Sequence, residues 1–249
     1  MSRRPSILLA AILGLAAVTA PAARAESTLV VCTEASPDAL NPQLSSANTS
    51  FDVGEQISDR LVEMRTGGSE LRPGLAEAWD VAPDGLRVTF HLRGGVAWQS
   101  NAHFQPTRAL DAEDVVFSFR RMMDHDDPFY RSANGTFPEF QVLLQSSLLA
   151  VDKVDERTVA FTLKAPLAPL PALLTMQPMG IVSAEYAATA LKAGHPEWLD
   201  QEPIGTGPFA FQRYAKDSQV RFRAFPGFWG RAGGQADRVA AVDNLVFSI

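Results

Sequence analysis

The stretch IGTGPFAFQRYAKDSQVRFRAFPGFWG, residues 204–230, decides the fold that the sequence predicts. It begins with Gly205-Thr206-Gly207-Pro208, a turn sequence in which glycine tolerates positive φ and proline directs the chain into an extended segment. Residues 209–214 and 220–224 then alternate apolar and polar side chains, and the link between them is short and polar. We therefore expect a β-hairpin.

The two glycines of this turn do not predict a dinucleotide-binding loop. Such a loop follows a strand and opens a helix. Here Pro208 and an alternating β pattern follow the second glycine. Nucleotide binding is therefore not expected at this place.

The order of motifs around the stretch resembles that of the extracytoplasmic solute-binding proteins of ABC importers, in the dipeptide and oligopeptide group known as family 5. The matching motifs are PIGTGPF, the hairpin, Phe228-Trp229-Gly230 and a strand at residues 245–247. Further matching stretches are TLVVCTEASPDALNPQL (28–44), RLVEM (60–64), PGLAEAWDVAPDG (73–85), VTFHLRGGVAW (88–98) and LDAEDVVFSFRR (110–121). The resemblance covers residues 28–249 and is closest to the dipeptide-binding branch, whose members are considerably longer than this chain.

The resemblance implies an α/β fold, a periplasmic-binding-protein-like type II lobe that carries an inserted small α+β domain. Residues 26–59 and 200–249 would form the two segments of this first lobe, residues 60–199 would form the insert, and the second lobe would be absent. The implied function is to bind dipeptides or short peptides in the periplasm by closure of two lobes. The implied partners are the peptide and the membrane permease subunits, the full-length protein would be a monomer, and neither a cofactor nor enzymatic activity is implied.

The resemblance also implies where the ligand lies. The matching positions are Thr33, Glu34, Ala35, Ser36, Pro37, Ser46, Ala47 and Asn48. A loop between a strand and a helix N-terminus presents free backbone N–H groups that suit a carboxylate or a peptide backbone, although a plain connecting loop has the same sequence. Phe137 matches an aromatic residue that covers the ligand in relatives, where it is often Tyr. Packing within its own domain is the alternative for this ring.

Residues 1–25 have the pattern of a secretory signal peptide. Arg3 and Arg4 are followed by an apolar run and by Ala23-Arg24-Ala25, which predicts cleavage after Ala25. The apolar run is too short for a permanent membrane helix, so no membrane insertion is expected. Removal of three arginines leaves 19 of the 22 basic residues against 28 acidic ones, a net charge of −9. This charge argues against nucleic acid as a partner.

Cys32 is the single cysteine of the chain. In an exported protein a lone cysteine indicates either a buried free thiol or a partner outside the sequence. The residues leave both open, and the resemblance favours the second, because relatives often bridge this position to a later cysteine. The run Leu29 to Cys32 predicts a buried strand. Leu245, Phe247 and Ile249 alternate up to the last residue, so we expect an exposed strand edge that favours association.

Several local patterns predict further elements. Thr49 or Ser50 is expected to cap a helix that buries Phe51, Ile57 and Leu61, and Asp111 with Asp114 is expected to open another helix. Ser183 and Gly194 are expected to bound a third. Hairpins are expected around residues 66–69 and 155–156, and a turn is expected at residues 83–85 before a strand.

No pattern in the sequence predicts a catalytic or metal site. The histidines lack ligand spacing, and no Gly-x-Ser-x-Gly elbow is present. Two alternatives to peptide binding stay open: a haem, glutathione or metal-complex binder of the same family, and a secreted hydrolase with an unrecognised site.

Overall fold

The computed structural model describes residues 25–249. All of the expected signal peptide except Ala25 lies outside the described residues. The strands are β1 (Thr28–Cys32), β2 (Val62–Met64), β3 (Leu71–Pro73), β4 (Ala76–Val81), β5 (Arg87–Leu92), β6 (Leu148–Asp155), β7 (Thr158–Leu163), β8 (Phe209–Ala215), β9 (Gln219–Ala224) and β10 (Asn244–Ser248). The α-helices are α1 (Asn48–Ile57), α2 (Ala112–Met123), α3 (Pro128–Ser132), α4 (Pro138–Leu143), α5 (Leu170–Leu173), α6 (Ala184–Ala193) and α7 (Trp198–Gln201). Short 3-10 helices are η1 (Pro42–Leu44), η2 (Gln177–Met179), η3 (Trp229–Arg231) and η4 (Ala236–Arg238).

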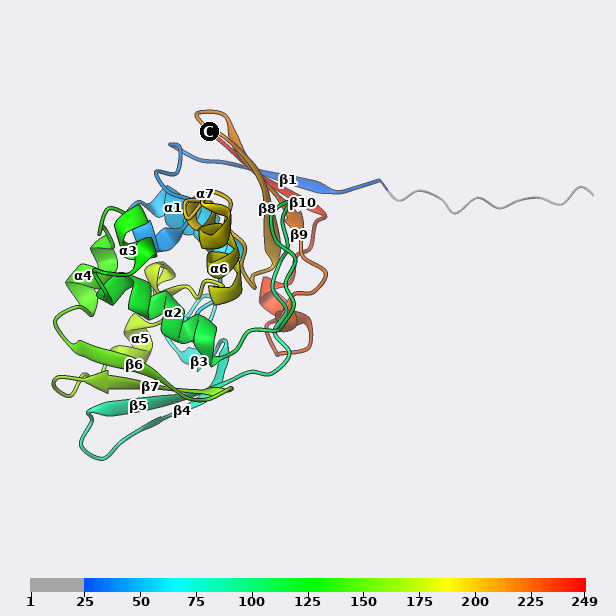
Figure 1. Cartoon of the computed structure of the whole chain (residues 1–249). Coiled ribbons are helices and arrows are strands. Elements are labelled where there is room, and N and C mark those ends of the chain that lie inside the picture. Colours follow the sequence, from blue (N-terminus) through cyan, green and yellow to red (C-terminus); the bar gives the residue numbers. More distant parts are fainter. Residues whose placement is uncertain (1–24) are drawn as a thin grey trace, which may run out of the picture.

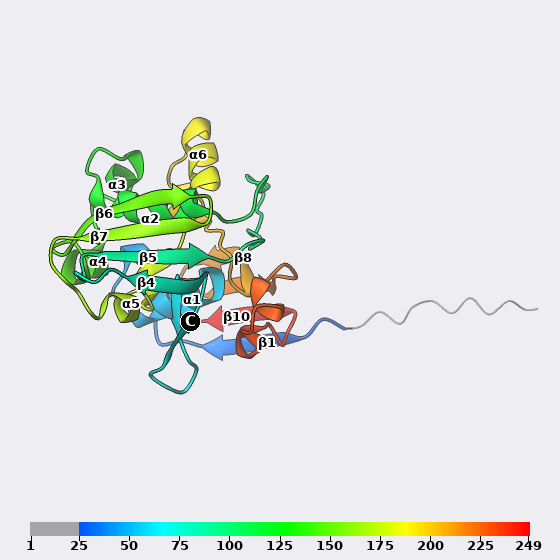
Figure 2. The same ribbon diagram turned by 90° about the horizontal axis from the view of Figure 1, so that it is seen from below.

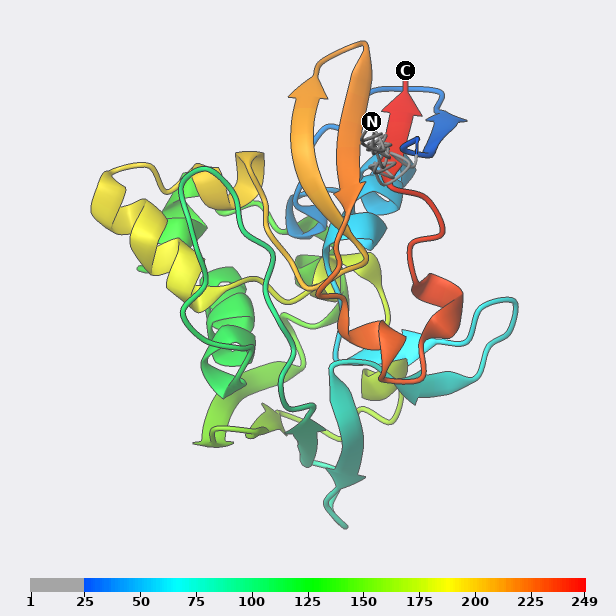
Figure 3. The ribbon, with the colours of Figure 1, turned by 90° about the vertical axis from the view of Figure 1, so that its right-hand side faces the viewer.

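The expected hairpin forms half of a four-stranded sheet with the order β1-β10-β9-β8. β9 lies between β8 and β10 and pairs with each of them in an antiparallel manner, and β1 pairs with β10 in parallel. Figure 3 shows the hairpin in orange, β10 in red and β1 in blue at the outer edge. One face of this sheet packs on α1 through an apolar cluster that includes Val53, Ile57, Phe209, Val220, Phe222, Leu245 and Phe247.

Helix α1 begins earlier than its sequence predicts. Its N-cap residue is Ala47, which offers no side-chain hydrogen bond, so the expected caps Thr49 and Ser50 lie inside the first turn. Phe51 is only half-buried, whereas Ile57 is fully buried as expected. Leu61 is buried too, but it lies beyond the end of α1 at Ile57. The cap rule failed because the hydroxyl of Ser50 bonds Asp38 and the amide of Ala39.

The glycines of the turn before β8 serve close packing rather than positive φ. Neither Gly205 nor Gly207 has a positive φ. A Cβ on Gly205 would lie 1.9 Å from the carbonyl oxygen of Ile57, and one on Gly207 would lie 2.7 Å from the same atom. The turn therefore presses its backbone against the end of α1, which only glycine permits.

A second four-stranded sheet has the order β4-β5-β7-β6 and is antiparallel throughout. Figure 2 shows its strands side by side. Helix α2 packs on β6 and β7, and its capping box is formed as expected, with Asp111 as N-cap and Asp114 at the third position. Helix α6 also matches its prediction, since Ser183 caps its start and Gly194 ends it with a φ of 82°.

Helices lie between the two four-stranded sheets, as Figure 1 shows. The β2–β3 hairpin forms a small third sheet, with residues 66–69 in its turn as expected. The predicted turn at Gly85 has a φ of 69°, also as expected.

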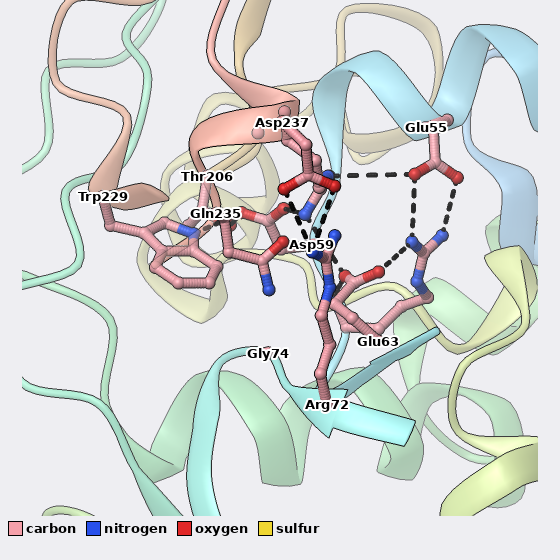
Figure 4. Close-up of polar contacts among 12 residues, drawn as sticks. Glu55, Asp59, Glu63, Arg72, Gly74, Thr206, Trp229, Gln235 and Asp237 are labelled. Atoms are coloured by element: carbon pink, nitrogen blue, oxygen red, sulfur yellow. Dashed lines mark hydrogen bonds and ion pairs between the residues drawn. The ribbon is translucent and has the colours of Figure 1, made fainter. Parts of the chain in front are cut away.

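Asp59 joins segments that lie far apart in the sequence. Its carboxylate accepts hydrogen bonds from Thr206 Oγ1 at 2.8 Å and Trp229 Nε1 at 2.6 Å, and it pairs with Arg238 Nη1 at 2.7 Å. Around it, Arg60 holds Glu55 with two hydrogen bonds and also contacts Glu63. Figure 4 shows the carboxylates of Glu55, Asp59 and Glu63 in this cluster. Burial raises the pKa of Glu63, although the neighbouring arginines oppose this shift. The cluster ties the end of α1 to the loop before β10.

Strand β1 is not the buried strand that its apolar sequence predicts. Leu29 is 49% and Val30 is 56% exposed, and Cys32 is a free, exposed cysteine. The buried-thiol interpretation is therefore wrong for this structure. The physical reason is position: β1 is an edge strand that only β10 flanks within residues 25–249. β10, by contrast, is paired on both sides, so the exposed edge that we expected belongs to β1.

Candidate functional site

The loop that follows β1 contains five of the predicted ligand residues, Thr33 to Pro37. Thr33 continues the pairing of β1, because its amide donates to the carbonyl oxygen of Ser248 at 2.8 Å. Ser36 and Asp217 hold each other through two hydrogen bonds of 2.8 and 3.0 Å. Tyr214 Oη donates to the carbonyl oxygen of Pro37 at 3.1 Å. The loop is therefore fixed to the β8–β9 hairpin, while Glu34 and Ala35 are exposed to solvent.

The second predicted segment, Ser46 to Asn48, lies at the start of α1. Ser46 and Asn48 are exposed, and Ala47 is half-buried. The amide of Ala47 donates to Ser45 Oγ at 2.9 Å, which fixes the approach to the helix. The exposed side chains of this segment, Ser46 and Asn48, are short and polar, and they lie at the N-terminus of α1.

Asp38 links the two segments. Its Oδ1 accepts hydrogen bonds from Ser45 Oγ at 2.5 Å and from Ser50 Oγ at 2.6 Å. Burial raises the pKa of this carboxyl, but the two hydroxyl donors outweigh burial and leave its pKa below the usual value. Asp38 thus stays ionised and holds the first loop against the helix. Sequence reasoning missed this residue and Asp217, because neither stands in a pattern that predicts its distant partner.

Phe137 lies elsewhere and has no exposed surface. It is fully buried at the start of α4, in the cluster that lies under the second sheet. The guanidinium of Arg121 lies 5.2 Å from the centre of its ring, and the ring of Tyr130 is 5.8 Å away. The structure therefore does not bring Phe137 to the surface that carries the other predicted residues. Its burial fits the packing alternative.

A cavity of about 750 Å³ borders the first loop. Its lining includes Asp38, Leu40, Phe211, Tyr214 and Asp200. Asp200 is already engaged, because Arg121 donates to both of its oxygens at 3.0 Å. The free polar surface here consists of hydrogen-bonding groups and exposed carboxylates. Such a surface can orient a polar ligand.

Residues 25–249 contain no group of three or more His, Cys, Asp or Glu side chains that could hold a metal ion. The histidines make separate pairs instead, such as His91 with Asp80 and His103 with Glu202. Among the same residues, none of the helices is both long and apolar enough to span a bilayer.

Comparison with known proteins assigns the chain to a class, that of solute-binding proteins. A solved structure, the dipeptide binding protein from Pseudoalteromonas sp. SM9913 in complex with Met-Leu, is similar with a TM-score of 0.83 and 31% identity. The match covers 89% of this chain and 43% of that one. The model of the bacterial extracellular solute-binding proteins, family 5 Middle, matches residues 70–249. The chain belongs to this family, and the expected mixed α/β fold is confirmed.

Two curated relatives bear different names. The dipeptide-binding protein of Escherichia coli (strain K12) is 46% identical over 239 residues, which cover 95% of this chain and 43% of the relative. Heme-binding protein A of Haemophilus influenzae is 41% identical over 226 residues, which cover 90% of this chain and 40% of the relative. The chain therefore spans less than half the length of these relatives, and both are named as binding proteins rather than enzymes.

Proposed function

We propose that this chain is the periplasmic substrate-binding component of an ABC importer and that it takes dipeptides or short peptides. The observation that carries the proposal is the 46% identity to a dipeptide-binding protein over 95% of the chain. Membrane permease subunits would be its partners. Binding without catalysis agrees with the names of the relatives.

The ligand would lie along Thr33–Pro37 and Ser46–Asn48. Two features support this location: both segments present exposed polar groups, and Asp38 holds them together. A rigid loop loses little conformational freedom when a ligand binds, which favours affinity. Phe137 remains a weaker candidate because its ring is buried.

We also propose the division of the chain into a lobe, residues 26–59 and 200–249, and an insert, residues 60–199. The composition of the sheets supports it, because β1, β8, β9 and β10 share one sheet while β2 to β7 form the other two. Closure of a second lobe over the first would enclose the peptide in a longer family member.

Haem is the second candidate ligand. It is favoured by the 41% identity to heme-binding protein A over 90% of the chain. The fold alone does not decide between the two, since both relatives match nearly the whole chain.

An amide NMR titration separates the two ligands. Dipeptide added to the labelled chain should shift the amides of residues 33–36 and 46–48, even at a Kd on the order of millimolar. The free amino acids at equal concentration serve as the ligand control. The second candidate would be favoured if the chain with added haem shows a visible absorption band of bound haem and dipeptides leave these amides unshifted. Shifts confined to other residues would contradict the proposed location.

Matched variants test the same site. Asp217→Gly keeps a residue that accepts the φ of 57° at this position but removes the carboxylate that holds Ser36. It should weaken dipeptide binding several-fold. Asp84→Ala, in the distant turn at residues 83–85, is the control and should leave the titration unchanged.

Export is the remaining part of the proposal. The exported protein should begin at Glu26, as the Ala23-Arg24-Ala25 pattern predicts. N-terminal sequencing of the periplasmic fraction tests this. An uncut Met1, or a lipid on Cys32, would contradict it.

A further inference from the structure

Arg121, on α2, is the largest of the fully buried side chains among residues 25–249. A buried charge is costly unless a charged or polar partner compensates it. The partner is Asp200 of α7, whose two carboxylate oxygens accept hydrogen bonds from Nη1 and Nη2 at 3.0 Å. Within the described residues Asp200 is also the carboxylate that forms the ion pair with Arg121. This pair fixes α7 to α2.

Asp200 extends the contact to a buried loop. Its Oδ1 also accepts a hydrogen bond from Asn41 Nδ2 at 2.7 Å. Asn41 is 2% exposed, and its own Oδ1 accepts from the amide of Gln43 at 3.0 Å, where Asn41 caps the 3-10 helix η1. The buried charge on α2 is therefore connected, through two side chains, to the start of η1.

The loop that contains η1, residues 38–45, lies between the two predicted ligand segments. Residues 33–37 precede it and residues 46–48 follow it. Asp38 and Ser45 join the two ends of the loop by a hydrogen bond. A displacement of this loop would therefore move both ligand segments.

The middle of the loop is attached to other parts of the molecule by side-chain amides. Asn41 donates to Asp200, and Gln43 Nε2 donates to the carbonyl oxygen of Gly180 at 3.0 Å. Leu40 of the loop and Asp200 of α7 line the same cavity of about 750 Å³. The bond from Asn41 thus sets how the loop lies against α7 at the border of the candidate site.

The geometry of Arg121 determines which way Asp200 points. A guanidinium that bonds both oxygens of a carboxylate fixes its orientation, and a hydrogen bond to an ionised acceptor is stronger than one between neutral groups. A lysine ammonium is a point charge and does not impose this orientation. The guanidinium is itself covered by the ring of Phe137, whose centre lies 5.2 Å away.

We propose that Arg121 is a positioning residue for ligand binding. It orients Asp200, and Asp200 holds residues 38–45 in place through Asn41. The loop held in this way presents residues 33–37 and 46–48 to the ligand. That the ligand is a peptide rests on the proposed function, whereas the connection between Arg121 and the loop does not.

Hydrogen exchange of the ligand-free chain, measured by NMR, tests the connection. Arg121→Lys keeps the charge but loses the bidentate hold on Asp200, so the amides of residues 43–45 should exchange several-fold faster. The amides of the central strands β5 and β7 should keep their rates. Equal acceleration in the loop and the strands would reveal a general loss of stability and overturn the proposal, as would unchanged rates at residues 43–45.

The matched control is the same substitution at the next residue of α2. Arg120 is 57% exposed and pairs with Asp127 at 3.5 Å. Arg120→Lys should leave the exchange at residues 43–45 as it is in the parent chain. Acceleration of the loop by the control to the same extent would also overturn the role of Arg121.

An interchange of the two partners tests the step from Asp200 to the loop. Asn41→Asp alone places two carboxylates at the 2.7 Å contact, and Asp200→Asn alone leaves Arg121 buried without its charge partner. Each should speed exchange at residues 43–45. The double variant restores one carboxylate and one amide and should exchange more slowly than either single variant. A double variant in which the two accelerations simply combine would mean that these residues act independently, and would overturn the proposed order of contacts.

Titration with a dipeptide connects the loop to the ligand. Arg121→Lys should weaken dipeptide binding several-fold, Arg120→Lys should not, and the double variant should bind better than Asp200→Asn. Faster loop exchange in Arg121→Lys with unchanged dipeptide affinity would overturn the positioning role. Failure of the proposed function would show itself separately, because the parent chain would then bind no dipeptide, while exchange at residues 43–45 would still decide whether Arg121 holds the loop.

Discussion

The indole N–H of Trp229 donates to the buried carboxylate of Asp59 at 2.6 Å, across 170 residues of sequence. Thr206 and Arg238 complete the coordination of this carboxylate. The contact therefore holds together the end of α1, the turn before β8 and the segment before β10.

Trp229→Phe should lower the free energy of unfolding by about 1–3 kcal/mol, because a hydrogen bond to a buried charged group is lost. Urea denaturation measures the change. Trp98→Phe is the matched control, since the Nε1 of this buried indole has no hydrogen-bond partner among residues 25–249. Equal losses in both variants would mean that ring volume, rather than the bond to Asp59, sets the cost.

Gly205→Ala should be severely destabilising, by about 3 kcal/mol or more, because a Cβ would lie 1.9 Å from the Ile57 carbonyl oxygen and force the backbone apart. Thermal or urea unfolding tests this. Gly68→Ala is the control: the nearest atom to its Cβ is 3.9 Å away and its φ is ordinary. A Gly205 variant as stable as the control would contradict the close packing.

Sequence predicted the parts of the fold that depend on neighbouring residues. The 209–224 hairpin, the capping box at Asp111 and the termination at Gly194 follow from local hydrogen bonding and backbone preference. The start of α1 was missed because Ala47 caps it without a side chain, while Ser50 bonds Asp38 instead.

Properties that depend on distant partners could not be predicted in the same way. The apolar sequence of β1 does not reveal that it is an edge strand, and the Gly-rich loop before Phe137 does not reveal that the ring is buried against Arg121. For the candidate site, the residues alone left the loop before α1 open between ligand binding and a plain connection, and the resemblance favoured binding and supplied the matching positions. Asp38, which links them, emerged only from the structure.

The ion pair of Asp237 with Arg72 predicts a response to acid. Hydrogen bonds from Arg72, with both carboxylate oxygens at 3.0 Å, and from Thr66 lower the pKa of Asp237 to about 2. The pKa of this carboxyl is 3.8 in the unfolded chain and lower in the folded one, so its ion pair stabilises the fold at pH values above 3.8. This contribution is lost as the pH falls toward 2.

Carboxyl NMR of Asp237 between pH 5 and pH 1.5 measures this pKa. Arg72→Gln should raise it toward 3.8, because both hydrogen bonds from the guanidinium are lost. Arg65→Gln is the control, since Arg65 pairs with Glu70 on the surface of the same hairpin and should leave Asp237 unchanged. An Asp237 that titrates near 3.8 in the parent chain would contradict the ion pair in solution.

Asp38→Ala should loosen the candidate binding surface without unfolding the chain. Asp38 is itself exposed, but its carboxylate is the acceptor for the hydroxyls of Ser45 and Ser50. Its removal leaves two largely buried hydroxyls without this partner, so the amides of Ala39 and Ala47 should exchange several-fold faster. Amide exchange by NMR measures this directly, and the dipeptide titration should weaken in parallel, because a mobile loop must be ordered on binding. Asp52→Ala, on the exposed face of α1, removes an equal charge near the same helix and should change neither measurement. If both variants weaken binding equally, the effect comes from charge, and the loop geometry set by Asp38 is not what positions the ligand.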